Sequence, residues 1–188
     1  MPMAYSDKQL EEAVSHVQGE WMLLADMASL LPQGRDRTLA EVAALEATFV
    51  HARCLVNFCS GGYAGNRNPA DIQPANFLGV DWWPRDEQFD QKLRGRLRLV
   101  NQAVQHLSWQ RVLDKEPVIW SVGFLAHEVD WAMRLFVEEL KTTDSRWFDR
   151  FALQGQLVRE RLPALDQPAE TKAHLAPARP NPIPPRAP

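Results

Sequence analysis

The sequence contains little cysteine and little excess charge. Only two cysteines occur in 188 residues, too few for a disulfide framework or a four-cysteine zinc site. The 21 lysine and arginine residues are nearly balanced by 24 aspartate and glutamate residues, which leaves a net charge of −3. The chain therefore lacks the global positive field of proteins that attract nucleic acid by net charge. These nearly equal numbers of basic and acidic residues still allow a local basic patch on the surface.

Long apolar runs and targeting signals are also missing. The apolar stretch WMLLADMASLL contains a charge and is too short to cross a bilayer. The N-terminus begins MPMAYSDKQLEE, with acidic residues where a signal peptide is basic and then apolar. These features predict a cytoplasmic protein that does not associate with membranes.

Several common catalytic and cofactor motifs are absent from the sequence. It contains no E-x-x-H, H-x-x-x-H or H-E-x-x-H pattern, so the usual helical metal sites are not predicted. It also lacks the glycine-rich phosphate loops and the G-x-S-x-G nucleophile motif. Cys54 and His51 lie three residues apart, but no third group that would orient the histidine is evident in the sequence. We therefore expect neither a metal nor a cofactor.

Apolar residues recur at helical spacing along most of the chain, and no segment alternates as a strand does. Ser6 is expected to cap a first helix that ends near Pro32. Thr38 and Glu41 form a T-x-x-E capping box, which predicts a second helix that runs to Gly61.

Three more helices are predicted in the second half of the chain. They span about residues 85–113, 117–141 and 146–161. Pro117 is expected in the first turn of the second of these helices, and Asp144-Ser145 is expected to cap the third. Residues 1–162 are therefore predicted to form one all-α domain, a bundle of about four to five helices. Residues 163–188 contain eight prolines and are expected to be disordered or partly polyproline II.

The stretch between the second and third predicted helices has a mixed character. Residues 60–85 are rich in glycine, asparagine, aspartate and proline, which is typical of loops and short turns. The same stretch carries Ile72, Phe77 and Leu78, so we expect it to pack on the bundle. Trp82 and Trp83 are interpreted as packing residues, with base stacking or a dimer contact as the alternative.

Two predicted helices each place polar side chains on one face. On the third helix, Arg98, Asn101 and His106 share a polar stripe with Gln102 and Gln105. On the second helix, the polar set next to the apolar stripe is Glu46, Arg53 and Asn57. If the faces meet, a carboxylate, two arginines, a histidine and amides converge, a set suited to holding phosphate and moving protons.

A structural explanation of these residues stays open. Helices in a small bundle always have a solvated face, and arginine, glutamine and asparagine fill it routinely. Glu46 and Arg53 are also compatible with a buried or half-buried ion pair that holds the second helix in place.

Two segments resemble bacterial proteins of the HEPN type. The first, LEATFVHARCLVNFCSG, follows the pattern E-x-x-φ-x-H-A-R-x-L-x-x-F. The second, RLRLVNQAVQHLSWQR, comes after a loop with DIQPANFLG. The resemblance covers about residues 40–115. The matching residues are Glu46, His51, Ala52, Arg53, Leu55, Phe58, Asp71, Phe77, Leu78, Arg98, Asn101, His106, Leu107, Ser108 and Arg111.

The resemblance implies a helical bundle that forms a homodimer and cleaves RNA without a metal, at a site shared across the dimer interface. It also implies a role in a toxin–antitoxin or phage-defence system, with an antitoxin as protein partner. The histidine of such a site acts as acid or base, and the arginine stabilises charge on the phosphate. The catalytic candidates are His106, Arg98, Asn101, Glu46 and Arg53.

The sequence departs from the HEPN pattern at the arginine. In the pattern, four to six residues lie between the arginine and the histidine, and the corresponding positions before His106 hold Leu99, Val100 and Asn101, not arginine. The alternative is therefore a catalytically silent HEPN-like module that binds nucleotide, RNA or a protein partner. A purely structural bundle is the third interpretation.

Overall fold

The computed structural model describes residues 5–31, 38–60, 71–80, 82, 122–143 and 145–162. These residues form five helices and no strands, which confirms the all-α prediction. The helices are α1 (Asp7–Ser29), α2 (Leu39–Ser60), α3 (Ala75–Leu78), α6 (Val122–Thr142) and α7 (Phe148–Arg161). None of these described helices combines the length and the apolar content needed to cross a bilayer.

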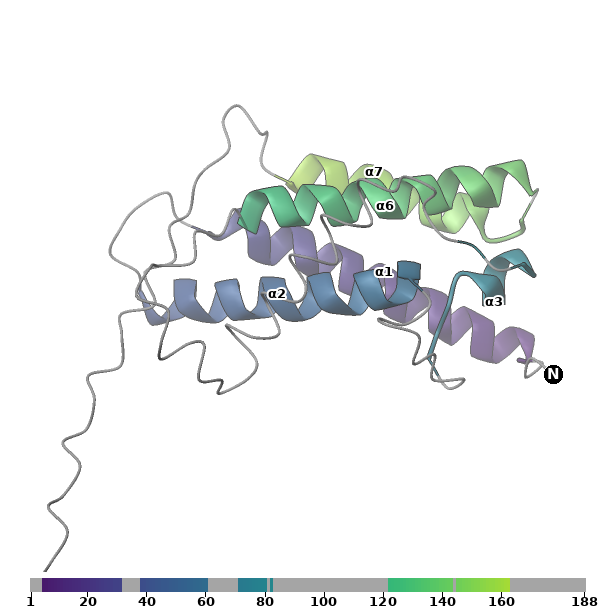
Figure 1. Cartoon of the computed structure of the whole chain (residues 1–188), viewed down its shortest axis with the longest axis horizontal. Helices are drawn as coiled ribbons and strands as arrows, with labels where there is room; N and C mark the ends of the chain where they lie inside the picture. Colours follow the sequence, from purple (N-terminus) through teal and green to yellow (C-terminus); the bar gives the residue numbers. More distant parts are fainter. Residues whose placement is uncertain are drawn as a thin grey trace, which may run out of the picture.

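The four long helices form a bundle (Figure 1). α1 packs mainly on α2 and α7, and α6 packs on the same two helices. α1 and α7 run in one direction while α2 and α6 run in the other (Figure 1). Two contacts between α1 and α7 agree with this parallel arrangement. The Gln18 side-chain amide donates to the Arg150 carbonyl oxygen, and Asp26, later in α1, pairs with Arg161, later in α7.

Local capping explains where the first two helices begin. Ser6 is the N-cap of α1, and it exchanges hydrogen bonds with Gln9 in a capping box. Glu41 accepts from the Thr38 backbone N–H, and Thr38 Oγ1 accepts from the Glu41 N–H, as the T-x-x-E pattern predicts. Both starts are therefore confirmed.

The start of α7 differs from the prediction. Helical geometry begins at Phe148, with Trp147 as an N-cap that makes no side-chain capping bond. The Ser145 hydroxyl donates instead to the carbonyl oxygen of Phe77 in α3, 3.2 Å away. The same hydroxyl oxygen also accepts from the backbone N–H of Trp147 at 3.4 Å, but residues 146 and 147 form a turn and the helix starts two residues later than predicted.

Other predictions lie outside the described residues. These are the helix expected over residues 85–113, the role of Pro117 in starting the next helix, Asp144 of the predicted cap, Trp83 and the proline-rich segment 163–188.

Aromatic side chains from all sides of the bundle meet in its core. Trp21, Phe49, Phe136 and Phe151 are the largest fully buried side chains. Phe77 of α3 joins them, with its ring centroid 5.7 Å from that of Phe151. The 71–80 segment is therefore packed on the bundle, as predicted.

The described tryptophans pack in the same way. Trp21 and Trp147 are buried. Trp82 is partly buried and lies edge-on to Phe136, at 5.6 Å between ring centroids. This contact agrees with the packing interpretation of Trp82, and its alternative role in base stacking or a dimer contact stays a prediction.

Candidate functional site

Two of the predicted catalytic residues, Glu46 and Arg53, lie on α2. They are seven residues apart, two helical turns, and so share one face. Glu46 is exposed and Arg53 is half-buried. Phe49 and Val56, close to them in sequence, turn into the core. The exposure of Glu46 excludes the fully buried ion pair that was considered as a structural explanation.

The other three candidates, His106, Arg98 and Asn101, lie outside the described residues. The predicted meeting of the two polar faces therefore stays a prediction. What α2 contributes is a carboxylate and a guanidinium presented on the side of the helix away from the core.

A second polar cluster joins α1 to α2. His51 Nδ1 donates to Glu20 Oε2 across 2.8 Å, and both side chains are partly buried. Cys54, one turn further along α2, also lies beside Glu20. Partial desolvation of the thiol, followed by the negative charge and hydrogen bond of Glu20, raises the pKa of Cys54.

This geometry supplies the third group that the Cys54–His51 pair lacked in the sequence, but it does not make a nucleophile. Desolvation and Glu20 raise the pKa of the Cys54 thiol, whereas an activated cysteine needs a lowered pKa. His51 instead joins α2 to α1 through its hydrogen bond to Glu20. Both cysteines are free; Cys59 is in the core, while Cys54 is exposed.

A buried carboxylate that sequence reasoning missed joins three helices. Asp130 of α6 has a side chain only 3% exposed. Its Oδ1 accepts from the indole N–H of Trp21 in α1 at 3.2 Å. Its Oδ2 lies 3.0 Å from Nε of Arg134, one turn along α6. His127 and Arg159 of α7 also act on it electrostatically.

Burial dominates the ionisation of this carboxylate. Desolvation raises the pKa of Asp130, and the cations of Arg134, His127 and Arg159 together with the Trp21 hydrogen bond oppose the rise only in part. In the sequence, His127 and Asp130 are three residues apart, and this spacing gives no sign of a carboxylate shared by three helices. The partners on α1 and α7 are far away in sequence.

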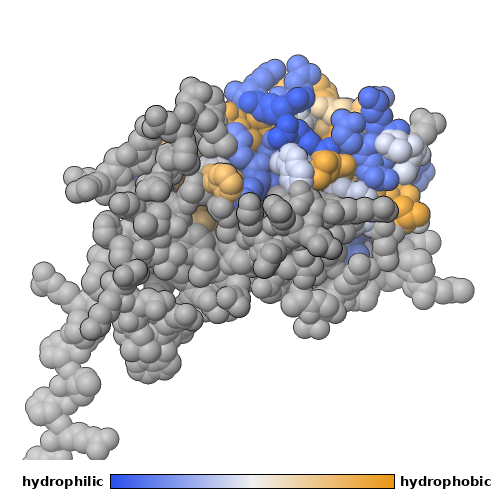
Figure 2. All heavy atoms as spheres, turned by 45° about the horizontal axis from the view of Figure 1, so that its top comes forward, coloured by the Kyte–Doolittle hydropathy of each residue, from blue (hydrophilic) through white to orange (hydrophobic). Residues whose placement is uncertain are grey.

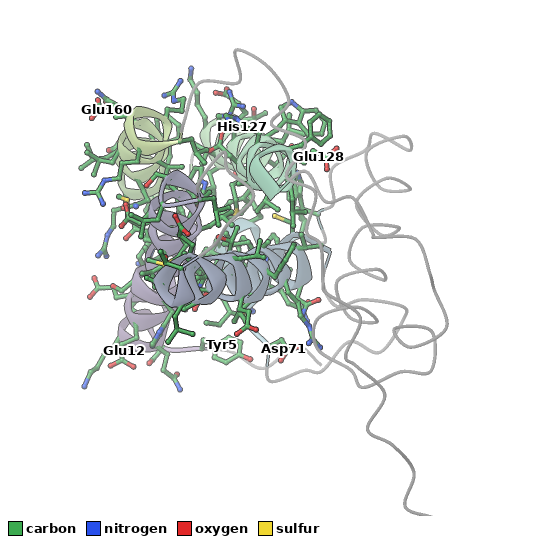
Figure 3. All side chains as sticks on the ribbon, turned by 90° about the vertical axis from the view of Figure 1, so that its left-hand side faces the viewer. Tyr5, Glu12, Asp71, His127, Glu128 and Glu160 are labelled. Atoms are coloured by element: carbon green, nitrogen blue, oxygen red, sulfur yellow. The ribbon has the colours of Figure 1, made fainter. Side chains whose placement is uncertain are left out.

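Polar side chains near the Asp130 cluster face outward. Hydrophilic residues gather over α6 and α7 on the upper part of the face in Figure 2. His127 and Glu160 lie along the same upper edge of the bundle in Figure 3, while Tyr5, Glu12 and Asp71 mark the opposite edge.

That opposite edge contains a shallow groove of about 210 Å³ between α1 and the 71–80 segment. Tyr5, Glu12, His16 and Ile72 are among its lining residues. Neither Glu46 nor Arg53, the two predicted catalytic residues within the described ranges, lines it. No group of three or more histidine, cysteine or acidic side chains within the described ranges is placed to hold a metal ion.

The raised pKa of Asp130 predicts the sign of a pH effect. A carboxyl whose folded-state pKa lies above its ordinary value of 3.8 binds protons more readily when folded, so it destabilises the protein at neutral pH. This penalty disappears as the pH falls from the raised pKa towards 3.8. We expect the free energy of unfolding of the wild type to rise relative to Asp130→Asn over that window, as measured by urea unfolding.

Asp7 is the matched control because its pKa shifts in the opposite direction, so its effect on stability should change with pH in the opposite sense. The exposed Arg146 guanidinium hydrogen-bonds to Asp7 and lowers the pKa of that carboxyl. Any stabilisation from Asp7 is therefore lost on acidification, relative to Asp7→Asn. A parallel pH dependence of the wild type and Asp130→Asn would contradict the assignment of Asp130 as a desolvated carboxylate.

The chain was also compared with known proteins, and no protein family, no curated protein and no solved structure matches it.

Proposed function

We propose that this chain is an HEPN-like helical protein that acts, as a homodimer, as a metal-independent ribonuclease of a toxin or phage-defence system. The main support for this proposal is the position of two of the predicted catalytic residues on α2. Glu46 and Arg53 of the E-x-x-φ-x-H-A-R segment share a face of α2 that points away from the core, while Phe49 between them is buried. In this helical phase Glu46 is exposed to a substrate, with the half-buried Arg53 on the same face.

The proposed chemistry uses side chains alone. His106 transfers a proton to or from the reacting oxygens of the RNA. Arg98 and Arg53 stabilise the charge that develops on the phosphate, and Asn101 donates an amide hydrogen bond in place of a further arginine. Glu46 orients an arginine by pairing with it. The homodimer brings two such sets to one interface.

The test is cleavage of labelled single-stranded RNA and tRNA by the purified protein in the presence of EDTA. We expect the wild type to cleave and His106→Ala to lose cleavage, because a general acid or base contributes about 10²–10⁴-fold in rate. Far-UV circular dichroism and the thermal midpoint establish that the variant is folded.

His16→Ala is the matched control. His16 is exposed on α1 and is not a member of the proposed site, so this variant should keep full activity. A DNA strand of the same sequence checks that cleavage depends on RNA. Absence of cleavage by the wild type, or equal loss in both histidine variants, would overturn the ribonuclease proposal and favour the silent binding module.

A further inference from the structure

One face of α2 carries exposed apolar side chains. Leu39 is 86% exposed and Val50 is 47% exposed, and Ala43 between them is exposed as well. The buried Ala52 and Leu55 lie on the opposite side of the helix, where α2 enters the core. Exposed apolar side chains that gather on one helix face are typical of a surface that binds another protein, whereas scattered ones are not.

The residues of this face recur at the spacing of two helices that pair lengthwise. They are alternately four and three positions apart, and we call them the outer α2 face: Leu39, Ala43, Glu46, Val50, Arg53 and Asn57. At 100° per residue, all six fall within about 80° of one another around the helix. An average spacing of 3.5 residues keeps such a face in contact with a second helix along its length.

The charges of the outer α2 face are complementary to themselves. Glu46 comes four residues before Val50, and Arg53 comes three residues after it. When a second α2 lies antiparallel, with a two-fold axis beside Val50, Glu46 faces the partner's Arg53 and Arg53 faces the partner's Glu46. A parallel pair would instead bring like charges together. The order of the charges therefore favours a second copy of this chain in the antiparallel arrangement.

We propose that two copies of this chain associate through the outer α2 face, with antiparallel α2 helices and with Glu46 of each copy paired with the partner's Arg53. The exposed surface of Val50 is removed from water at the centre of the contact. Glu46 and Arg53 lie at one edge of the face and Ala43 at the other, so the ion pairs lie at the rim, where an RNA strand can reach them. The inference rests on the proposed function in taking a homodimer as the active form, whereas the exposed residues and their charge order are independent of it.

The first experiment measures the dissociation constant of the homodimer by sedimentation equilibrium. Glu46→Arg and Arg53→Glu each replace both ion pairs of the two-fold contact by like charges, so each variant should form a dimer about tenfold weaker than the wild type. An equimolar mixture of the two variants should form a heterodimer of nearly wild-type affinity, because both pairs are then again opposite in charge. A pairing within one chain could not give this rescue.

Glu138→Arg is the matched control. Glu138 is exposed on α6, so this variant makes the same change of charge away from the outer α2 face and should leave the dissociation constant unchanged. The thermal midpoint establishes that each variant is folded. Equal weakening by Glu138→Arg and Glu46→Arg, or a mixture of Glu46→Arg and Arg53→Glu that stays as weak as its components, would overturn the interface.

Cross-linking tests the position of the two-fold axis. In a Cys54→Ser background, in which the other cysteine, Cys59, is buried, Val50→Cys should form a disulfide-linked dimer under mild oxidation. A disulfide requires Cα atoms within about 7 Å of each other, so Val80→Cys, at an exposed position outside α2, should stay unlinked. Equal cross-linking at both positions would contradict the proposed arrangement.

The outcomes also separate the interface from the ribonuclease proposal. A dimer that shows the charge rescue but does not cleave RNA would uphold the interface and reject the ribonuclease function. RNA cleavage by a wild-type dimer whose affinity is unaffected by Glu46→Arg and Arg53→Glu would reject the interface and leave the ribonuclease proposal intact.

Discussion

Replacing Phe77 with alanine is expected to lower the free energy of unfolding by about 3–5 kcal/mol. The side chain is 6% exposed. Four rings surround it, those of Phe58, Phe136, Trp147 and Phe151, at centroid distances of 5.7–6.2 Å. Rings held by three different long helices cannot collapse fully into the cavity, so both the transfer and the cavity contributions are lost. Urea unfolding measures the change.

Val80→Ala provides the control on the same segment. Val80 is 57% exposed, so its truncation should change stability by no more than about 0.5 kcal/mol. If Phe77→Ala were as mild as Val80→Ala, the 71–80 segment would not be an integral part of the core. Limited proteolysis should reveal the same difference between the two variants, because a segment that has lost its buried anchor is cleaved more readily.

Gly155→Ala is expected to destabilise the protein by about 1–2 kcal/mol, although alanine is the better helix former. A Cβ at Gly155 would lie 2.8 Å from the Cη2 atom of Trp21. The indole ring is fully buried and hydrogen-bonded to Asp130, so it cannot move aside without losing that bond. Overpacking therefore outweighs the gain in helix propensity, which amounts to about 1 kcal/mol.

The same substitution at Gly19 should have the opposite sign. Gly19 lies within α1 and is exposed, and a Cβ added there would meet no neighbouring atom within 4 Å. Gly19→Ala is thus expected to stabilise the protein by about 0.5–1 kcal/mol. Thermal and urea unfolding of both variants provide the comparison, and a stabilising Gly155→Ala would show that α7 is free to move away from Trp21.

Most of the local structure was predictable from the sequence. Ser6, Thr38 and Glu41 act within their own helix turns, so their capping roles follow from residues three positions apart. The apolar spacing likewise predicted which face of α1 enters the core. The start of α7 was misplaced by two residues, and the bond from Ser145 to Phe77, 68 residues away in sequence, was not predictable.

The candidate site also contains features that follow from one helix alone and features that depend on neighbouring helices. The shared face of Glu46 and Arg53 follows from helical geometry alone, whereas the exposure of Glu46 depends on what packs beside α2. The environment of Cys54 was not predictable either, because Glu20 comes from another helix. Whether His106, Arg98 and Asn101 join the α2 pair stays a prediction of the resemblance.

By itself, the sequence determined the all-α class, the phase of the helices and the first two N-caps, because these depend on interactions within about one turn of helix. Only the tertiary structure decided which polar groups meet. Trp21 and Asp130 are 109 residues apart and form a buried hydrogen bond, while Arg159 approaches them from a third helix. A buried carboxylate requires hydrogen-bond or charge partners. For Asp130 some of these partners come from other helices, so the spacing of residues within one helix cannot predict them.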